Sequence, residues 1–236
     1  MKIELLFPDL CNLFGDNANP RYLRKCLPDA EFIETDLSQV PAFVEQNDIN
    51  LIYMGPMTES MQEKVINKLR EYKERIQELI QKGTCFLMTG NSLEVFGEFI
   101  ENEDGSRIEG LGLYQTHAKR DMMNRFNGLM LGEFQDIPIV GFKSQFAQSY
   151  GENQENYFVK VTRGPGINKD SSYEGIKMNN FIATYVLGPI LILNPLFTKY
   201  LLKQMGVEEP KLAFEEAVMA AYEQRLKEFQ DETIKF

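Results

Sequence analysis

The chain has 236 residues, 43% of them hydrophobic and 25% charged, which is typical of a folded protein with a sizeable core. Its formal net charge of −10 argues against nucleic acid and anionic membranes as partners. The longest apolar stretch, residues 181–193, is interrupted by polar residues, glycine and proline, and it is shorter than the roughly 20 residues of a membrane helix. The first residues read as a strand rather than as a signal peptide. We therefore expect a soluble, cytoplasmic protein with one domain spanning residues 1–236.

Cysteine and histidine are too few for common metal chemistry. Cys11, Cys26 and Cys85 are widely and irregularly spaced, and they form neither a CxxC pair nor an even disulfide framework. His117 is the single histidine, which excludes imidazole clusters and any mechanism that needs two histidines. We expect no metal and no cofactor.

Strands and helices alternate in the first part of the chain, the pattern of parallel βαβ units. The expected strands are residues 3–7, 30–34 and 50–54, and a short helix is expected at residues 20–26. Between residues 59 and 81 apolar side chains recur every three or four positions. This spacing predicts one amphipathic helix that covers a sheet and ends at Gly83.

A sharp turn follows the next apolar run. Residues 85–88 read as a central parallel strand, and Thr89, Gly90, Asn91 and Ser92 turn the chain out of it. Such a strand-turn-helix elbow directs backbone amides at one point and is a common place for nucleophiles and oxyanion holes. By geometry alone, a plain strand-to-helix connection is equally consistent with the pattern.

The second half consists of short apolar runs separated by glycine and acidic turns. Runs at residues 99–101, 129–131, 137–142 and 157–161 predict an antiparallel part of a mixed sheet. A second apolar segment follows at residues 180–193, and helices are expected at residues 195–205 and 211–229.

Several segments, in the same order along the chain, resemble the CobB/CobQ-like glutamine amidotransferases. They are FPDLCNLFGD (7–16), IYMG (52–55), FG (96–97), IEGLGL (108–113), NR (124–125), IVGF (139–142) and ATYVLGPIL (183–191). Within that family the chain is similar to the glutaminase subunit of lipid II isoglutaminyl synthase, whose partner is a Mur-ligase-like protein. The resemblance implies an α/β chain with the flavodoxin-like class I glutamine amidotransferase fold: a mixed, mostly parallel sheet flanked by helices.

The same resemblance shows two departures at the catalytic positions. The family elbow reads Cys-Gly-Gly-Tyr-Gln, whereas this chain has Thr89 or Gly90 at the nucleophile, depending on whether the count starts from the strand or from Gly97. The closing family motif Tyr-Leu-His-Gly-Pro has Leu187 at the catalytic histidine. Hydrolysis through a thioester needs a thiolate and an adjacent base, so both halves of the dyad are expected to be missing.

Three other side chains are possible substitutes for the missing dyad, and each has a structural interpretation. Cys85 lies four residues before Thr89, about 13 Å along an extended strand, and is expected inside the sheet. Ser92 is not in a GxSxG elbow and is read as a helix start. His117 is expected at a strand end beside a charged loop, in a satisfied or solvated position rather than a catalytic one.

The resemblance also points to a ligand pocket. The implied substrate-binding residues are Gly55, Asn91 and Arg125, and a guanidinium such as that of Arg125 can pair with a ligand carboxylate through two hydrogen bonds. Gly55 precedes Pro56 where the family has an oxyanion-hole turn, and proline has no N–H to donate. A surface salt bridge remains the alternative for Arg125.

Three functions are consistent with these features. The leading hypothesis is a non-hydrolytic family member that acts as a binding or regulatory subunit with a Mur-ligase-like or other ATP-dependent synthetase. The alternative is an active glutaminase subunit that supplies ammonia for amidation of a cell-wall precursor or corrinoid carboxylate. The third is a free-standing protein that binds glutamine or another small carboxylate.

Overall fold

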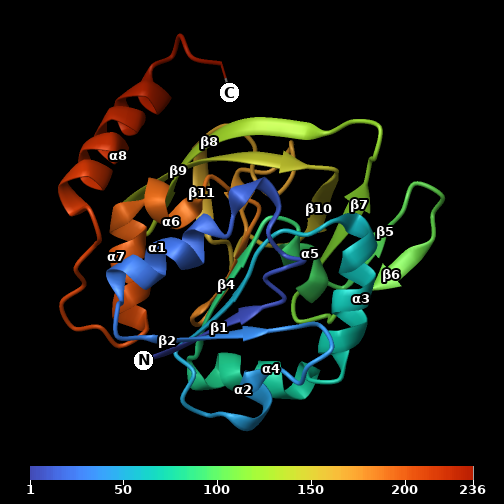
Figure 1. Cartoon of the computed structure of the whole chain (residues 1–236). Coiled ribbons are helices and arrows are strands. Elements are labelled where there is room, and N and C mark those ends of the chain that lie inside the picture. Colours follow the sequence, from blue (N-terminus) through green and yellow to red (C-terminus); the bar gives the residue numbers. More distant parts are fainter. Residues whose placement is uncertain (236) are drawn as a thin grey trace.

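The computed structural model describes residues 1–235, and at its centre is a six-stranded sheet in the order β13-β14-β4-β3-β1-β2 (Figure 1). Its strands are β1 (Lys2–Leu6), β2 (Glu31–Thr35), β3 (Leu51–Met54), β4 (Cys85–Thr89), β13 (Ile176–Met178) and β14 (Phe181–Thr184). Five of them run parallel, and β13 at one edge is antiparallel. The strands predicted in the first part of the chain are confirmed to within one or two residues.

Apolar side chains cover both faces of the central strands. In β3, Ile52 and Met54 belong to one core cluster, while Leu51 and Tyr53 belong to another. Successive side chains of a strand point to opposite faces, so the two clusters lie on opposite sides of the sheet. A strand buried on both faces requires the continuous apolar run seen in the sequence.

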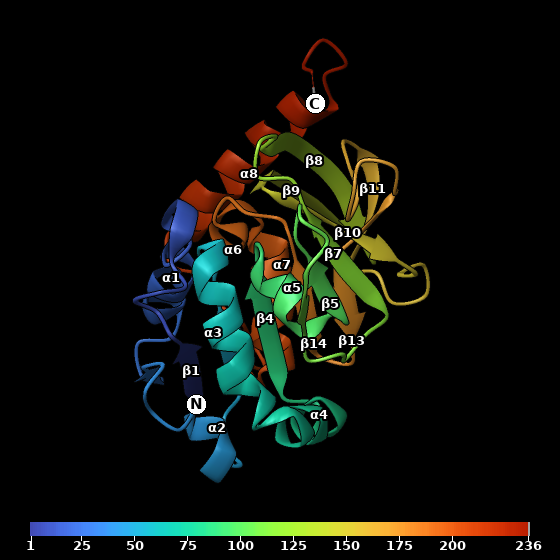
Figure 2. The ribbon, with the colours of Figure 1, turned by 90° about the vertical axis from the view of Figure 1, so that its right-hand side faces the viewer.

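Helices cover both faces of this sheet (Figures 1 and 2). On one face lie α2 (Ala42–Glu45), α3 (Glu59–Arg70), α4 (Lys73–Lys82) and α5 (Ser92–Phe96), whose apolar side chains join the first cluster. On the other face lie α1 (Ala18–Cys26), α6 (Ile190–Leu193) and α7 (Pro195–Gln204), which pack in the second cluster. A single 3-10 turn, η1 (Leu13–Gly15), precedes α1.

The prediction of one continuous helix over residues 59–81 is wrong, because the chain breaks between α3 and α4. Tyr72 leaves helical geometry, with φ −113° and ψ 13°, and its ring packs edge-on against Phe43 at 6.2 Å. Leu69 before the break and Ile76 after it both enter the same core cluster. The apolar spacing therefore continues across two helices that face one core. Gly83 ends α4 with φ 86°, as predicted.

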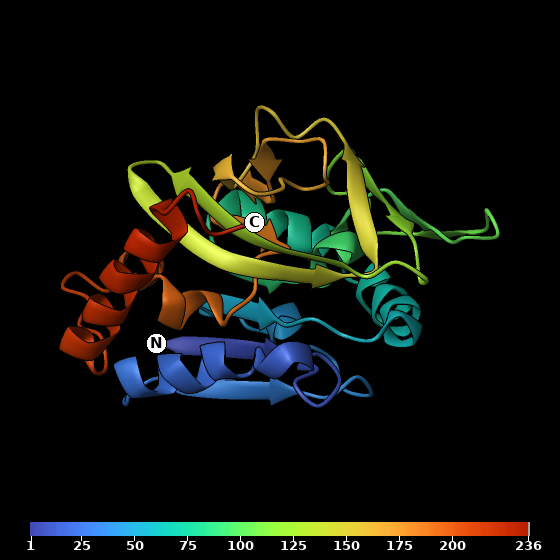
Figure 3. The same ribbon diagram turned by 90° about the horizontal axis from the view of Figure 1, so that it is seen from above.

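Two further four-stranded sheets flank the central one (Figure 3), so the predicted antiparallel part of a single mixed sheet is wrong in its connectivity. The first contains β5 (Phe99–Glu101), β6 (Arg107–Glu109), β7 (Thr116–Arg120) and β10 (Ala147–Gly151). The second contains β8 (Phe126–Phe134), β9 (Ile137–Gln145), β11 (Val159–Arg163) and β12 (Tyr173–Glu174). They separate because their apolar residues pack on opposite sides of the centre: Ala118 and Ala147 in the first core cluster, Met130 and Ile139 in the second.

The C-terminal helix α8 (Glu215–Gln230) lies along the outside of β8 and β9 (Figure 1). It begins four residues later than predicted, because Phe214 before it has φ 55°. Tyr222 anchors it by donating a hydrogen bond of 2.7 Å to the Pro138 carbonyl. Among residues 1–235 we find no helix that is long and apolar enough to cross a membrane.

Candidate functional site

The elbow predicted after β4 is present, and Gly90 is at its tip. Gly90 has φ +60°, between the end of β4 and the start of α5. This backbone conformation favours glycine, and in nucleophile elbows it belongs to the reacting residue. Ser92 does not face outward as a nucleophile: its hydroxyl donates to the Thr89 carbonyl at 2.7 Å and tightens the turn.

Two apolar side chains fill the space in front of Gly90. A Cβ atom added at Gly90 would lie 2.6 Å from Cβ of Pro56 and 3.3 Å from Cδ2 of Leu187. The first distance is shorter than any normal carbon contact. No side chain fits at the tip of the elbow unless Pro56 moves, and Leu187, at the predicted histidine position, is part of this cover.

The amide of Asn91 is used to hold the neighbouring loop. Its Oδ1 accepts a hydrogen bond from the Met57 N–H at 2.9 Å, and its Nδ2 donates to the Met57 carbonyl at 2.7 Å. Gly55, on the same loop, packs so closely that a Cβ there would lie 2.4 Å from the Cys11 carbonyl oxygen. Thus Asn91 occupies both backbone hydrogen-bonding groups of Met57, next to Pro56. Glycine is needed at position 55 because the Cys11 carbonyl packs against it. Ligand binding by either residue stays a prediction.

A buried polar cluster lies directly below the elbow. The Thr89 and Tyr53 hydroxyls both donate to Asp16 Oδ2, and Asn19 donates to Asp16 Oδ1 at 3.0 Å. Burial raises the pKa of Asp16, while these three hydrogen bonds oppose the shift. The side-chain Oδ1 of Asn19 accepts from the Leu191 N–H at 3.0 Å and so connects the cluster to α6. Thr89 is fully buried here and is a structural donor.

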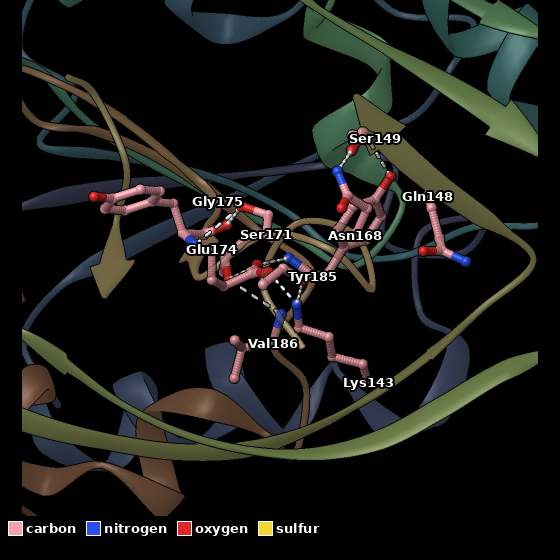
Figure 4. Close-up of polar contacts among 12 residues, drawn as sticks. Lys143, Gln148, Ser149, Asn168, Ser171, Glu174, Gly175, Tyr185 and Val186 are labelled. Atoms are coloured by element: carbon pink, nitrogen blue, oxygen red, sulfur yellow. Dashed lines mark hydrogen bonds and ion pairs between the residues drawn. The ribbon is translucent and has the colours of Figure 1, made fainter. Parts of the chain in front are cut away.

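The segment that carries Leu187 is held by a buried ion pair (Figure 4). Lys143 on β9 pairs with Glu174 on β12, and both side chains are 0% exposed. The other oxygen of Glu174 accepts from the Thr184 hydroxyl at 2.9 Å and from the Tyr185 N–H at 2.8 Å. Two residues further on, Leu187 forms an isolated β-bridge with Phe142, the neighbour of Lys143. The ion pair therefore fixes the approach of Leu187 to the elbow.

A second buried carboxylate lies on the elbow helix itself. Glu94 accepts hydrogen bonds from Gln62 at 2.8 Å and from the Tyr185 hydroxyl at 3.0 Å. The Tyr185 hydroxyl also lies 2.7 Å from Ser149 Oγ, and the side-chain Oε1 of Gln62 accepts from Arg120 at 2.7 Å. Burial raises the pKa of Glu94 to about 7, although its hydrogen bonds act in the opposite direction.

Arg125, the predicted carboxylate clamp, is exposed on the turn between β7 and β8. Its guanidinium lies 4.5 Å from the centre of the Phe146 ring and 6.0 Å from that of Phe14. Cation–π contact holds it in place, and a surface salt bridge, the alternative expectation, does not form within residues 1–235. Its binding of a ligand stays a prediction.

The remaining candidates lie apart from the elbow tip or are chemically inert. His117 is inside β7 rather than at a strand end, and its ring stacks on Phe99 at 4.7 Å. Cys11 and Cys85 are buried, and burial raises the pKa of each thiol to about 12. A thiol with such a pKa has almost no thiolate at neutral pH. No group of three or more metal-ligating side chains gathers within the described chain.

The buried charged residues that sequence reasoning missed include Glu94, Lys143 and Glu174, and the sequence contains a signal for the first two. Glu94 interrupts an otherwise apolar elbow helix between Leu93 and Val95. Lys143 falls on the inward side of β9, where the period-two pattern places core residues. Glu174 has no comparable signal, because its partners are distant in sequence.

The mostly parallel sheet, its flanking helices and the elbow at Gly90 define a protein of the class I glutamine amidotransferase fold. More particularly, the chain belongs to the CobB/CobQ-like glutamine amidotransferase domain family, which it matches over residues 2–194.

Individual relatives agree with this assignment. The chain is 25% identical over 224 residues to lipid II isoglutaminyl synthase (glutamine-hydrolyzing) subunit GatD of Streptococcus pneumoniae (strain ATCC BAA-255 / R6), covering 92% of this chain and 86% of the relative. It is 28% identical over 170 residues to the subunit of the same name from Staphylococcus aureus (strain N315), covering 72% and 68%.

Solved structures share the fold at low sequence identity. PurLQS from Thermotoga maritima is 10% identical with a TM-score of 0.55, and the match covers 95% of this chain and 98% of that one. A second glutamine amidotransferase is 11% identical with the same TM-score of 0.55, covering 86% and 99%. At this identity the likeness concerns the fold alone.

The buried ion pair leads to a stability prediction. Lys143→Met leaves Glu174 buried without its cation and is expected to lower the free energy of unfolding by about 3–5 kcal/mol. Adding Glu174→Gln should recover part of the loss, because the amide still accepts from Tyr185 but carries no charge. Lys199→Met, which breaks the partly exposed pair with Glu215, is the matched control and should cost about 1 kcal/mol or less. Urea denaturation measures all three, and a loss in Lys143→Met no larger than in the control would contradict the role of the pair.

The environment of Glu94 predicts a pH dependence of stability. Its pKa is raised to about 7 from an ordinary 4.5, so the folded state binds the proton more tightly than the unfolded state. The contribution of Glu94 to the free energy of unfolding is fully present below pH 4.5. It is lost as the pH rises through 7, by up to about 3 kcal/mol. Glu94→Gln should therefore gain stability relative to the wild type between pH 5 and pH 8. Urea denaturation across this range tests it, with the exposed Glu98→Gln as control; a constant difference between Glu94→Gln and wild type would refute the prediction.

Proposed function

We propose that this chain is a non-hydrolytic member of the CobB/CobQ-like family and acts as a binding or regulatory subunit of a Mur-ligase-like, ATP-dependent synthetase. The observation that carries the proposal is the packing of Pro56 and Leu187 against Gly90. Glutamine hydrolysis through a thioester requires a thiolate at the elbow and a base beside it. Here the tip of the elbow has no side chain, and apolar atoms occupy the space that a side chain would need.

The surrounding polar groups support the same conclusion. A tetrahedral intermediate needs backbone N–H donors that are free to reach its oxygen. Pro56 has no N–H, and the Met57 N–H already donates to Asn91. The elbow thus keeps the backbone shape of a nucleophile site, while its donors are engaged within the protein.

The partner is inferred from the relatives. Both curated relatives are named as subunits of lipid II isoglutaminyl synthase, a name that describes an assembly acting on a cell-wall precursor. Their similarity covers most of this chain, 92% of it for one relative and 72% for the other. Hence a synthetase partner is the assembly that the chain is best suited to join. An active glutaminase subunit remains the alternative, and ammonia release decides between the two.

The first test concerns ammonia. The purified protein, alone and with a Mur-ligase-like synthetase from the same organism, should release no ammonia from glutamine above background. The physical reason is the absence of a thiolate and an imidazole at Gly90 and Leu187. Ammonia is measured with an enzyme-coupled assay, with Cys85→Ala and Cys11→Ala as variants. Robust release that either variant abolishes would overturn the proposal.

The second test concerns restoration of the dyad. Gly90→Cys should destabilise the protein by about 1–3 kcal/mol, because its Cβ overlaps Pro56. Gly105→Cys is the matched control, since Gly105 also has a positive φ, +81°, but nothing within 4 Å of its Cβ position. Gly90→Cys with Leu187→His should give at most weak glutaminase turnover, and adding Pro56→Gly should increase it. Turnover equal to that of an active family member in the double variant would show that only two side chains had been lost.

A further inference from the structure

Exposed apolar side chains gather at one rim of the molecule. Among residues 1–235, the exposed large apolar side chains are Met1, Phe14, Val40, Met122, Met123 and Phe214. Three of these, Phe14, Met122 and Met123, flank Arg125 in sequence or in space. Met123 is 86% exposed, and neighbouring exposed apolar side chains are more informative than a single one. We refer to Phe14, Met122, Met123, Arg125 and Phe146 as the rim.

The rim is ordered although it is exposed. Asn124 donates to both carboxylate oxygens of Asp121 at 3.0 Å, which closes the turn that carries Met122 and Met123. The Asp121 N–H donates to the Phe146 carbonyl and joins this turn to the chain after β9. The rim therefore presents its side chains on a fixed backbone, which lowers the entropic cost of binding.

Arg125 is the charged centre of the rim. Its guanidinium stacks on Phe146 at 4.5 Å and faces Phe14 at 6.0 Å, and no carboxylate within residues 1–235 forms an ion pair with it. A stacked guanidinium still has its in-plane N–H groups available to a carboxylate. In a chain of net charge −10, this held cation selects for a complementary anionic group.

The rim lies next to the elbow. Leu13, the residue before Phe14, donates its N–H to the Pro56 carbonyl at 3.1 Å. Pro56 in turn contacts Gly90. A protein partner that covers the rim would therefore reach the edge of the candidate site.

We propose that the rim is the docking surface for the synthetase partner, and that the partner presents a carboxylate to Arg125 among apolar side chains that cover Phe14 and Met123. This inference rests on the proposed function. Arginine, phenylalanine and methionine are enriched at protein interfaces, and a stacked arginine is a typical energetic centre. A free amino acid would use Arg125 but would leave the methionines exposed, so the apolar part of the rim favours a protein.

The test measures the affinity of the full-length chain for a Mur-ligase-like synthetase from the same organism by calorimetry. Arg125→Glu and Met123→Glu should each weaken binding at least about tenfold, as expected for residues at the centre of an interface. Val40→Glu and Phe214→Glu place the same charge at exposed apolar positions elsewhere and should bind as the wild type does. Equal melting temperatures of all variants establish that the fold is kept.

The chemistry at Arg125 is tested separately. Arg125→Lys keeps the positive charge and offers an amine to a carbodiimide, which joins an amine and a carboxylate only in direct contact. Mass spectrometry of the complex should find a cross-link from position 125 to an aspartate or glutamate of the synthetase. If the cross-link appears only between two copies of this chain, or if glutamate alone binds and Arg125→Glu abolishes that binding but not the complex, the inference is overturned.

Failure of the inference and failure of the proposed function are distinguishable. A wild-type complex that survives Arg125→Glu and Met123→Glu overturns the docking surface and leaves the subunit role intact. Absence of any complex with wild type overturns both.

Discussion

The architecture of the site depends on the contacts of one buried carboxylate, that of Glu174. It forms an ion pair with Lys143 on β9. It also accepts hydrogen bonds from the Thr184 hydroxyl and the Tyr185 N–H at the end of β14. One buried group thus joins the second small sheet to the central sheet. Because a buried charge must be paired, these elements cannot separate without a large cost. The chain that leaves β14 is therefore directed across the elbow, and Leu187 arrives over Gly90.

The elbow combines the backbone of a catalytic turn with the packing of a core. Gly90 keeps the positive φ that places a side chain at the end of the central strand, and α5 begins immediately after it. Around it, the Met57 N–H donates to Asn91, Pro56 has no N–H to donate, and Asp16 accepts from the hydroxyls beneath. Each of these groups makes its contacts within the protein. These contacts are the basis of our proposal that the fold serves assembly rather than hydrolysis.

Sequence patterns predicted what is local and missed what is long-range. The apolar runs at β3 and β4 and the glycine at position 90 specify the parallel strands and the elbow, since period and turn chemistry are local properties. The break at Tyr72 was hidden because both helices face one core. Glu94 and Glu174 were missed because their partners lie up to 91 positions away, and no spacing rule connects such residues. The contact of Arg125 with Phe14 likewise joins residues more than a hundred positions apart.

The contact between Gly90 and Pro56 also constrains the paths by which this sequence can change. A side chain at position 90 is sterically disfavoured while proline occupies position 56, and removing Pro56 first leaves a gap beside a glycine. Either single step is unfavourable, so the two positions are epistatic and their substitutions have a preferred order. Once a lineage has acquired both Pro56 and Gly90, packing alone disfavours the loss of either residue, independently of selection on activity. Close relatives that carry proline at the position of Pro56 are then expected to carry glycine at that of Gly90.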